Sequence, residues 1–262
     1  MKLLEKVVAA VMAMAMLTAC SGGGGGAGGG TPVAPSTFSS TKTYQLVQSG
    51  QGKPLYMEFW QAYTDDKGAL ILDKDDIMKE GVSHSGTYAD FYVENTLTVT
   101  LITANGKDYA VLYSGTSTYD EYAEAAIRGG AEIPKGKNIY VDTKLVNQAW
   151  FGNPNESPVD PGKLDASDMT VEIGTYTMPG TSEKYYAEIF TYKTDPGHKI
   201  TYAYDNNDEL KAVEEVFNNN RIDVMVFNKF KFDSPEFKIS KLNVANYGAI
   251  DITSAYLAGL GK

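Results

Sequence analysis

Apolar and polar residues alternate along much of this chain, most regularly in residues 222–232, and this period of two is typical of a β-strand. Shorter runs rich in aromatic and β-branched residues, bounded by turn residues, predict further strands. These runs are residues 43–48, 55–63, 69–72, 91–103, 108–114, 138–146, 169–178, 185–194, 198–204, 237–242 and 249–253. Asn105-Gly106 is the strongest hairpin signal, because both central positions of a type I′ turn need positive φ.

Helical signals are fewer than strand signals. Thr118-x-x-Glu121 resembles a capping box that opens a helix, which Gly129 would close. Residues 73–80 predict a short helix, and residues 81–90 a loop.

A third helix is predicted over residues 210–217, where Leu210, Val213 and Phe217 form one apolar face after a possible cap at Asn206. The 18 tyrosines and ten phenylalanines of the chain favour sheet. The predicted fold class is therefore α+β, mostly antiparallel β-sheet with a few short helices.

The folded part divides at a polar, proline-rich stretch, which predicts a first α+β unit at 43–151, a linker at 152–168 and a second unit at 169–262. Tyr56-x-Glu58 and Tyr186-x-Glu188 are similar segments 130 positions apart. One interpretation is a tandem duplication of a βββαβββ unit. The other is a chance alignment of tyrosine-rich strands, because two copies are weak evidence for a repeat.

The N-terminal residues 1–19 have the pattern of a secretion signal, with Lys2 and Lys6 before the apolar residues 7–16. That apolar run is too short to span a bilayer. Leu17-Thr18-Ala19-Cys20 follows and resembles the lipobox of bacterial lipoproteins. The resemblance implies cleavage before Cys20, a diacylglycerol thioether on its sulfur and an acylated amine, so the partner of this end is a membrane. The alternative is an ordinary buried or unpaired cysteine.

Residues 20–42 contain mostly Gly, Ser, Thr, Pro and Ala, and they predict a disordered tether. A Gly-rich coil of this length has a root-mean-square reach of roughly 25 Å. Cys20-Ser21 followed by five glycines also resembles the leader of surface-displayed Gram-negative lipoproteins of the transferrin-binding and factor H-binding kind. This resemblance implies surface display, and Ser21 after the cysteine resembles lipoproteins sent to the outer membrane.

The chain is acidic, with a formal net charge of −10 that becomes about −11 once the leader's two lysines and one glutamate are removed. An acidic surface repels phosphate backbones, so we expect no nucleic-acid partner. Cys20 is the only cysteine, so lipidation would leave no disulfide and the body would depend on its core.

Few residues suggest catalysis. His84 and His198 are the only histidines, and no metalloprotease, phosphate-loop or nucleophile-elbow motif is present. Ser83 beside His84 does not by itself make a nucleophile and base, and His198 after a Pro-Gly turn is typical of an exposed residue. Glu58 and Glu188 could act as an acid–base pair across a cleft, but strand alternation favours a solvated face.

Two acidic runs, at residues 73–76 and 205–209, do not have the spacing of a calcium loop. We therefore expect no catalytic, metal or cofactor site, and no enzymatic activity.

The remaining candidates are aromatic residues that could contact a protein or small-molecule partner. They are Trp60, Tyr63, Tyr186, Phe190 and Tyr192. The sequence predicts a lipid-anchored envelope lipoprotein that acts as a binding or structural module. The alternatives are a surface receptor for a host factor or nutrient, and an envelope hydrolase.

Overall fold

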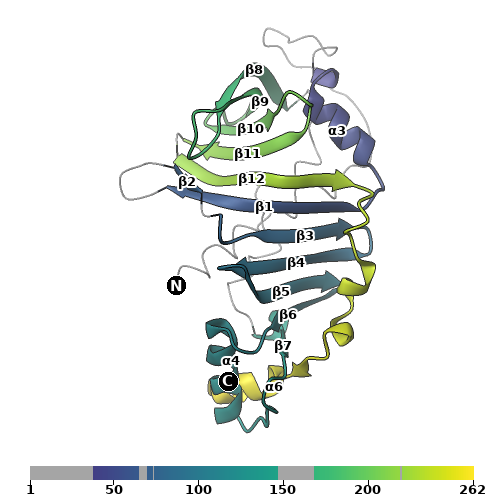
Figure 1. The fold of residues 1–262 in the computed structure, drawn as a ribbon, viewed down its shortest axis with the longest axis vertical. Helices are drawn as coiled ribbons and strands as arrows, with labels where there is room; N and C mark the ends of the chain where they lie inside the picture. Colours follow the sequence, from purple (N-terminus) through teal and green to yellow (C-terminus); the bar gives the residue numbers. More distant parts are fainter. Residues whose placement is uncertain (1–37, 65–69, 73, 147–167, 219) are drawn as a thin grey trace.

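A computed structural model describes residues 38–64, 70–72, 74–146, 168–218 and 220–262. Its main feature is one large sheet, almost entirely antiparallel, in the order β13-β7-β6-β5-β4-β3-β1-β12-β11-β10-β9-β8, with β2 paired to β1 (Figure 1). The strands are β1 (Leu55–Thr64), β2 (Leu70–Leu72), β3 (Met78–Ser83), β4 (Gly86–Val93), β5 (Thr96–Ala104), β6 (Lys107–Leu112), β7 (Ile139–Asp142), β8 (Met169–Thr177), β9 (Lys184–Tyr192), β10 (His198–Tyr204), β11 (Leu210–Phe217), β12 (Asn220–Phe232) and β13 (Ile250–Asp251).

Short helices and 3-10 turns lie beside the strands of this sheet. They are α3 (Lys42–Gly50), α4 (Ser117–Arg128), α5 (Thr143–Val146) and α6 (Thr253–Gly259), with the 3-10 turns η3 (Ile239–Leu242) and η4 (Val244–Tyr247). The predicted class, a mostly antiparallel sheet with a few short helices, is confirmed at this level.

The chain forms the sheet in two passes. From β1 it proceeds outward through β3, β4, β5 and β6 to β7, and it then resumes at the opposite edge with β8. Successive strands lead back to the middle, where β12 pairs with β1 in the register Leu55 to Phe232. The strands of the two predicted units therefore belong to one continuous hydrogen-bonded sheet.

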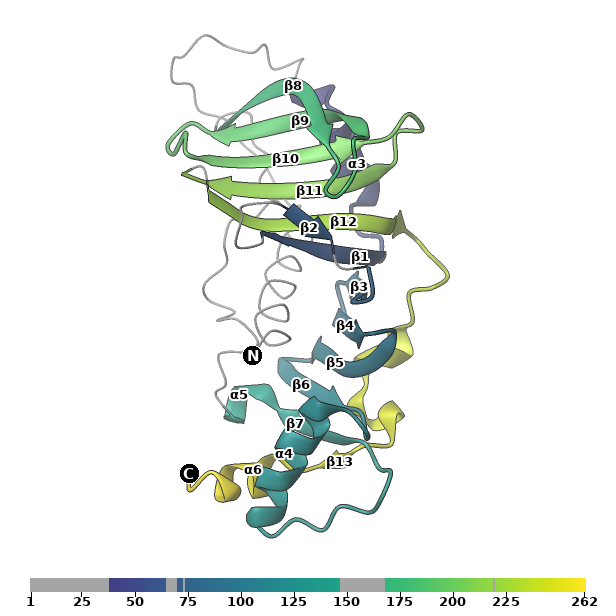
Figure 2. The same cartoon turned by 60° about the vertical axis from the view of Figure 1, so that its left-hand side comes forward.

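We call the two sides of the sheet the inner and outer faces. The inner face carries the main hydrophobic cluster, which includes Phe59, Phe190 and Met225 together with residues of α3, α4 and α6. Figure 2 shows α3 beside β8 to β12 and α4 with α6 at the other end. The outer face carries two smaller clusters, one around Ala212 and one around Ile102.

Helices α4 and α6 approach closely through small residues. A Cβ atom added to Gly129 would lie 1.9 Å from the carbonyl oxygen of Ala255, and one added to Gly259 would lie 1.8 Å from that of Ala125. Tyr122 and Tyr256 stack beside this contact, with ring centroids 4.6 Å apart. Glycine is needed here for the close approach of two backbones.

Several sequence predictions are confirmed. The alternating residues 222–232 lie in β12. Asn105 and Gly106 have φ values of 54° and 73° in the turn between β5 and β6. Helix α4 ends at Gly129 as predicted, although its cap is Thr116 rather than Thr118, because the Thr116 side chain accepts the N–H of Tyr119.

Other local predictions are wrong. Residues 43–48 form α3 instead of a strand. Most of residues 73–90 form the β3–β4 hairpin instead of a helix and a loop. Residues 91–103 are divided between β4 and β5 by a turn at Glu94 and Asn95, both with positive φ. The predicted strand at 138–146 ends at Asp142, where α5 begins.

The C-terminal half contains a further reversal. Residues 210–217 form β11, because their backbone pairs with β10 on one side and β12 on the other. The proposed cap at Asn206 is instead a hairpin turn, in which Asp205 accepts the N–H groups of Asn207 and Glu209. Residues 237–242 include η3 rather than a strand, and the last strand is only two residues long before α6.

The tandem duplication is not confirmed. The helix predicted for the second unit, residues 210–217, is a strand. The similar segments also face opposite ways. Tyr56 and Glu58 lie on the outer face, because their neighbours Met57 and Phe59 belong to the inner-face cluster, whereas Tyr186 packs against that cluster. A one-residue difference in register places equivalent side chains on opposite faces. The predicted linker lies outside the described residues except for residue 168.

Candidate functional site

The described body begins at Phe38, and Cys20 lies outside the described residues. Phe38 is only 4% exposed, and its ring makes edge contacts with Phe190 at 5.5 Å and Tyr44 at 6.1 Å. Residues 38–42, which the sequence analysis placed in the tether, thus belong to the packed body. The sequence did not predict this packing, because a single Phe in a stretch rich in Gly, Ser and Thr is weak evidence for a buried segment.

Glu188 joins this beginning of the body to the sheet. Its Oε1 accepts the N–H of Lys42 at 2.7 Å, and its Oε2 accepts the N–H and the hydroxyl of Thr43 at 2.8 and 2.6 Å. The first N–H groups of a helix have no partner within the helix, so a carboxylate satisfies them and interacts favourably with the helix dipole. A strand residue thereby fixes the start of α3.

Aromatic residues complete the surroundings of Glu188. Tyr186 donates its hydroxyl to Oε1 at 3.0 Å, and burial together with this bond raises the pKa of Tyr186 to about 12. Tyr204 bonds the hydroxyl of Thr43 at 2.8 Å, and the Lys42 ammonium lies 4.3 Å from the Tyr186 ring centroid. The expectation that Glu188 lies on a solvated face is wrong, since it is fully buried where it accepts the first N–H groups of α3, next to the N-cap residue Thr41.

Glu58 has a different environment from Glu188. It accepts the Tyr56 hydroxyl at 2.9 Å and the Asn228 amide at 2.9 Å, on the outer face. The two carboxylates therefore lie on opposite faces of the sheet and do not form an acid–base pair.

The candidate partner-binding aromatics are not one patch. Phe190 is fully buried in the inner core and is not available to a partner. Trp60 is half-buried on the outer face, where its indole N–H donates to the carbonyl of Lys74 at 3.1 Å. Tyr186 and Tyr192 pack against the inner-face cluster. The side chain of Tyr63 lies outside the described part of the structure.

The two histidines have separate structural settings. His84 is exposed in the β3–β4 turn, where the hydroxyl of the adjacent Ser83 donates to the carbonyl of Gly86 at 3.2 Å. His198, predicted to be exposed, is largely buried between the rings of Tyr192 and Phe217, and its Nε2 lies 2.6 Å from Glu215. Neither arrangement resembles a nucleophile with its base.

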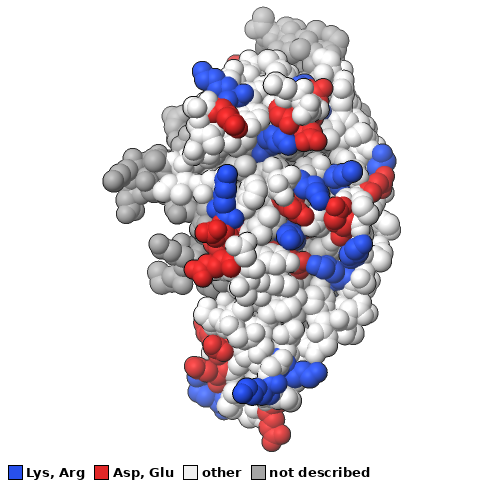
Figure 3. Space-filling model, viewed as in Figure 1, with Lys and Arg blue, Asp and Glu red and all other residues white. Residues whose placement is uncertain are grey.

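Charged residues on the outer face are paired with one another. Lys229 donates to Glu236 at 2.7 Å, and Ser234 also bonds that carboxylate. These two bonds lower the pKa of Glu236 to about 2. Lys241 pairs with the buried Asp90. Acidic and basic side chains are accordingly interspersed over the middle of the sheet in Figure 3, which leaves no patch of one sign there.

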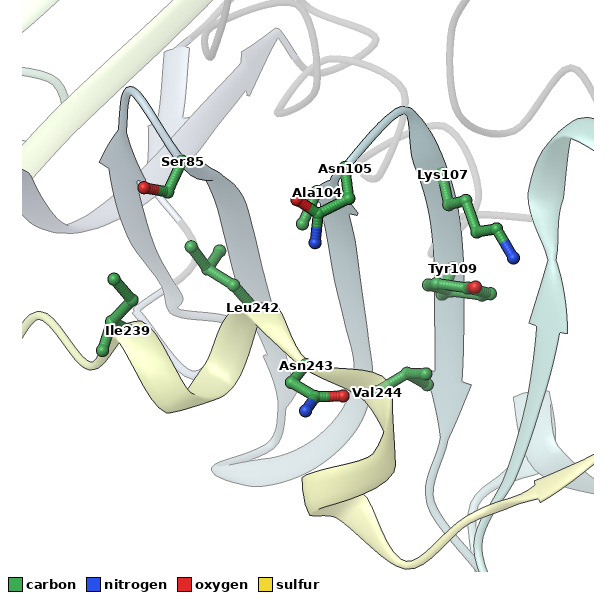
Figure 4. Close-up of a pocket in the computed structure, with 9 residues that line it drawn as sticks. All are labelled: Ser85, Ala104, Asn105, Lys107, Tyr109, Ile239, Leu242, Asn243 and Val244. Atoms are coloured by element: carbon green, nitrogen blue, oxygen red, sulfur yellow. The ribbon is translucent and has the colours of Figure 1, made fainter.

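A pocket of about 410 Å³ lies where the ends of the β3–β4 and β5–β6 hairpins meet the η3–η4 segment. Its lining comes from the β3–β4 turn, from β5 and β6, and from η3 and η4 (Figure 4). The volume is within the range of small-molecule sites. No sequence signal pointed to it, because the hairpin residues and the C-terminal residues that line it are at least 130 positions apart in the chain.

The lining of the pocket is apolar on one side and polar at its rim. The apolar part consists of Ala104, Tyr109, Leu242, Val244 and the exposed Ile239. The polar part consists of Ser85, Asn105, Lys107 and Asn243. This combination suits a ligand with an apolar body and a polar group.

Two further properties bear on function. Within the described ranges, no three His, Cys, Asp or Glu side chains are arranged to hold a metal ion. None of the helices described is both long enough and apolar enough to cross a membrane.

The comparisons with known proteins concern only the arrangement of the chain. No protein-family model matches the sequence, and no curated protein matches it. Among solved structures, MucB matches with a TM-score of 0.39 and 8% identity, over 83% of this chain and 66% of that one. A DUF1329 family protein from Desulfovibrio piger matches with a TM-score of 0.29 and 10% identity, over 83% of this chain and 100% of that one.

A domain from Vibrio parahaemolyticus, provisionally described as an outer membrane lipoprotein-sorting protein, matches with a TM-score of 0.30 and 7% identity. The match covers 79% of this chain and 97% of that one. This chain therefore spans just under two thirds of the MucB chain and nearly all of the other two. All three TM-scores are below 0.5, so the function proposed below rests on this chain's own residues.

Proposed function

We propose that this protein is a lipid-anchored envelope lipoprotein whose β-sheet body is a binding module. The observation that carries the proposal is the sequence Leu17-Thr18-Ala19-Cys20 between a secretion-type leader and a Gly-rich stretch. Two or more acyl chains on one cysteine anchor a protein stably, whereas one chain binds reversibly. The outer membrane and its surface are the proposed location, because Ser21 follows Cys20.

The beginning of the body supports this arrangement. Phe38 is packed into the core, and Glu188 fixes the first turn of α3 four residues later. Seventeen residues, 21–37, separate Cys20 from Phe38. A body attached in this way is held near the membrane while its outer face and pocket can meet a partner.

The binding role is supported by the pocket between the hairpin ends and η3–η4. The contacts of His84 and His198 do not favour a hydrolase, and no described contact favours a host-factor receptor over another binding role. We therefore propose a non-enzymatic module.

Metabolic labelling tests the anchor. Cells that express the full chain should incorporate radioactive palmitate into the native protein, and a Cys20→Ser variant should carry none. The native protein should also sediment with the membrane fraction, while the variant is released. Equal label in both proteins, or no label in either, would exclude the anchor.

A further inference from the structure

We infer that the pocket between the hairpin ends and η3–η4 binds a small amphipathic anion, namely a carboxylate with a short apolar body. This inference rests on the proposed binding role of the body and specifies its ligand class.

The apolar part of the pocket accounts for the apolar body of the ligand. Leu242 and Val244 come from η3 and η4, Ala104 from the end of β5, and the Tyr109 ring from β6. In Figure 4 these side chains project into one space between the strands and the C-terminal segment. Ile239 at the edge of the pocket is 64% exposed. A ligand that covered Ile239 would remove this apolar surface from water.

Charge accounts for the anionic group. Lys107 is the one cation among the lining residues, which include no acid. Among the described residues, Lys107 forms no ion pair. Lys144 of α5, whose ammonium donates to the carbonyl of Gly106 in the same turn, instead lies 3.3 Å from Asp108. Whatever the net charge of the chain, a lining with one cation and no acid locally favours an anion over a cation.

Hydrogen bonding adds to this preference. The Asn105 side chain has no hydrogen-bond partner among the described residues, and Figure 4 shows it hanging from the end of β5 into the pocket. The Asn243 Oδ1 accepts the N–H of Ala245 at 3.1 Å, so its amide N–H₂ group remains as a donor. Lys107, Asn105 and Asn243 therefore each bring N–H donors to the rim of the pocket, and N–H donors are the groups that carboxylate oxygens accept.

The test uses the chain from residue 20 to 262 with Cys20→Ser, so that neither acyl chains nor detergent compete for the ligand. Calorimetric titration with 4-phenylbutyrate and with its neutral amide compares the anion with a ligand of almost the same shape. We expect the acid to bind more tightly than the amide. Lys107→Met should weaken acid binding by up to about fivefold, the size that an exposed ion pair supplies, and leave amide binding unchanged. Lys135→Met, which removes an exposed lysine outside the pocket, should change neither.

Val244→Phe should fill the pocket and abolish binding of both ligands. Because this variant could also perturb packing, NMR spectra of the unsubstituted protein provide a second measurement. Adding 4-phenylbutyrate should shift the backbone N–H resonances of Tyr109 and Leu242. Equal affinity for acid and amide would overturn the ligand class and leave the binding role. Absence of binding by both would overturn the ligand class and the binding role of the pocket. Neither result affects the palmitate test of the anchor.

Discussion

Thr43 and Glu188 lie 145 residues apart in the chain, and the backbone N–H and the hydroxyl of Thr43 both donate to Glu188 Oε2. This contact connects the first helix of the body to a strand near the far edge of the sheet. It also connects the proposed lipid anchor to the folded body, because the chain from Cys20 enters the body just before Thr43.

Removal of the Glu188 carboxylate should destabilise the body. Glu188→Ala leaves the N–H groups of Lys42 and Thr43 buried without their acceptor, and we expect a loss of about 2–3 kcal/mol in the free energy of unfolding. Denaturant unfolding measures this loss. Compared with the native chain, the variant should show a larger increase in hydrogen-exchange rate in α3 than in β12.

Glu58→Ala is the matched control, because Glu58 also accepts a tyrosine hydroxyl two residues earlier but lies partly exposed on the outer face. We expect a cost below about 1 kcal/mol. Equal costs for the two variants would contradict the role of Glu188 as the buried acceptor for the first N–H groups of α3.

The contact between α4 and α6 should not tolerate a methyl group. A Gly→Ala change inside a helix normally stabilises it by up to about 1 kcal/mol. We expect Gly259→Ala instead to destabilise the protein by about 1–3 kcal/mol, because the new Cβ meets the carbonyl oxygen of Ala125. The melting temperature measures the difference.

The neighbouring Ala258 provides the control for α6, since it is exposed in the same turn. Ala258→Gly should cost no more than about 1 kcal/mol from helix propensity alone. A stabilising effect of Gly259→Ala would show that the two helices are not in backbone contact.

The buried Asp90 should depend on Lys241. Lys241→Met leaves Asp90, which is 1% exposed, with the Thr100 hydroxyl, at 2.7 Å, as its side-chain donor among the described residues. We expect a loss of about 2 kcal/mol, reduced from the value for a fully buried pair because Lys241 is partly exposed. Adding Asp90→Asn to Lys241→Met should recover part of the loss, and a double variant less stable than the single one would contradict this pairing.

Alkaline pH should destabilise the protein. Burial raises the pKa of Tyr88 from 10 to about 12, and burial likewise raises that of Tyr113 to about 12. The neutral phenol is favoured in the folded state, so the stabilisation is complete below pH 10 and is lost as the pH rises from 10 to 12. For Tyr88 alone the loss is about 2–3 kcal/mol.

Denaturant unfolding between pH 9 and 12, with tyrosinate absorbance recorded in parallel, measures this effect. Tyr88→Phe should have a shallower pH dependence than the native chain. An unchanged free energy of unfolding up to pH 12 would show that these tyrosines ionise normally in the folded protein.

The sequence by itself determined the features that depend on neighbouring residues. The alternation of residues 222–232 predicted β12, and Asn105-Gly106 predicted a hairpin, because positive φ at both positions is a local requirement. Gly129 also predicted the end of α4, although its own φ is −84° and the positive φ of 93° belongs to the next residue, Gly130. The lipobox at Cys20 is also local, and its lipidation stays a prediction.

Only the tertiary structure decided the elements whose partners are distant in the chain. Residues 43–48 have strand-forming side chains, but they form a helix whose N-cap is Thr41 and whose first N–H groups are accepted by the distant Glu188. Residues 210–217 have helix-forming side chains, but hydrogen bonds to β10 and β12 make them a strand. The pocket likewise joins the β5–β6 hairpin to η3–η4. Local propensity is worth less than about 1 kcal/mol per residue, so buried hydrogen bonds and packing from distant residues override it.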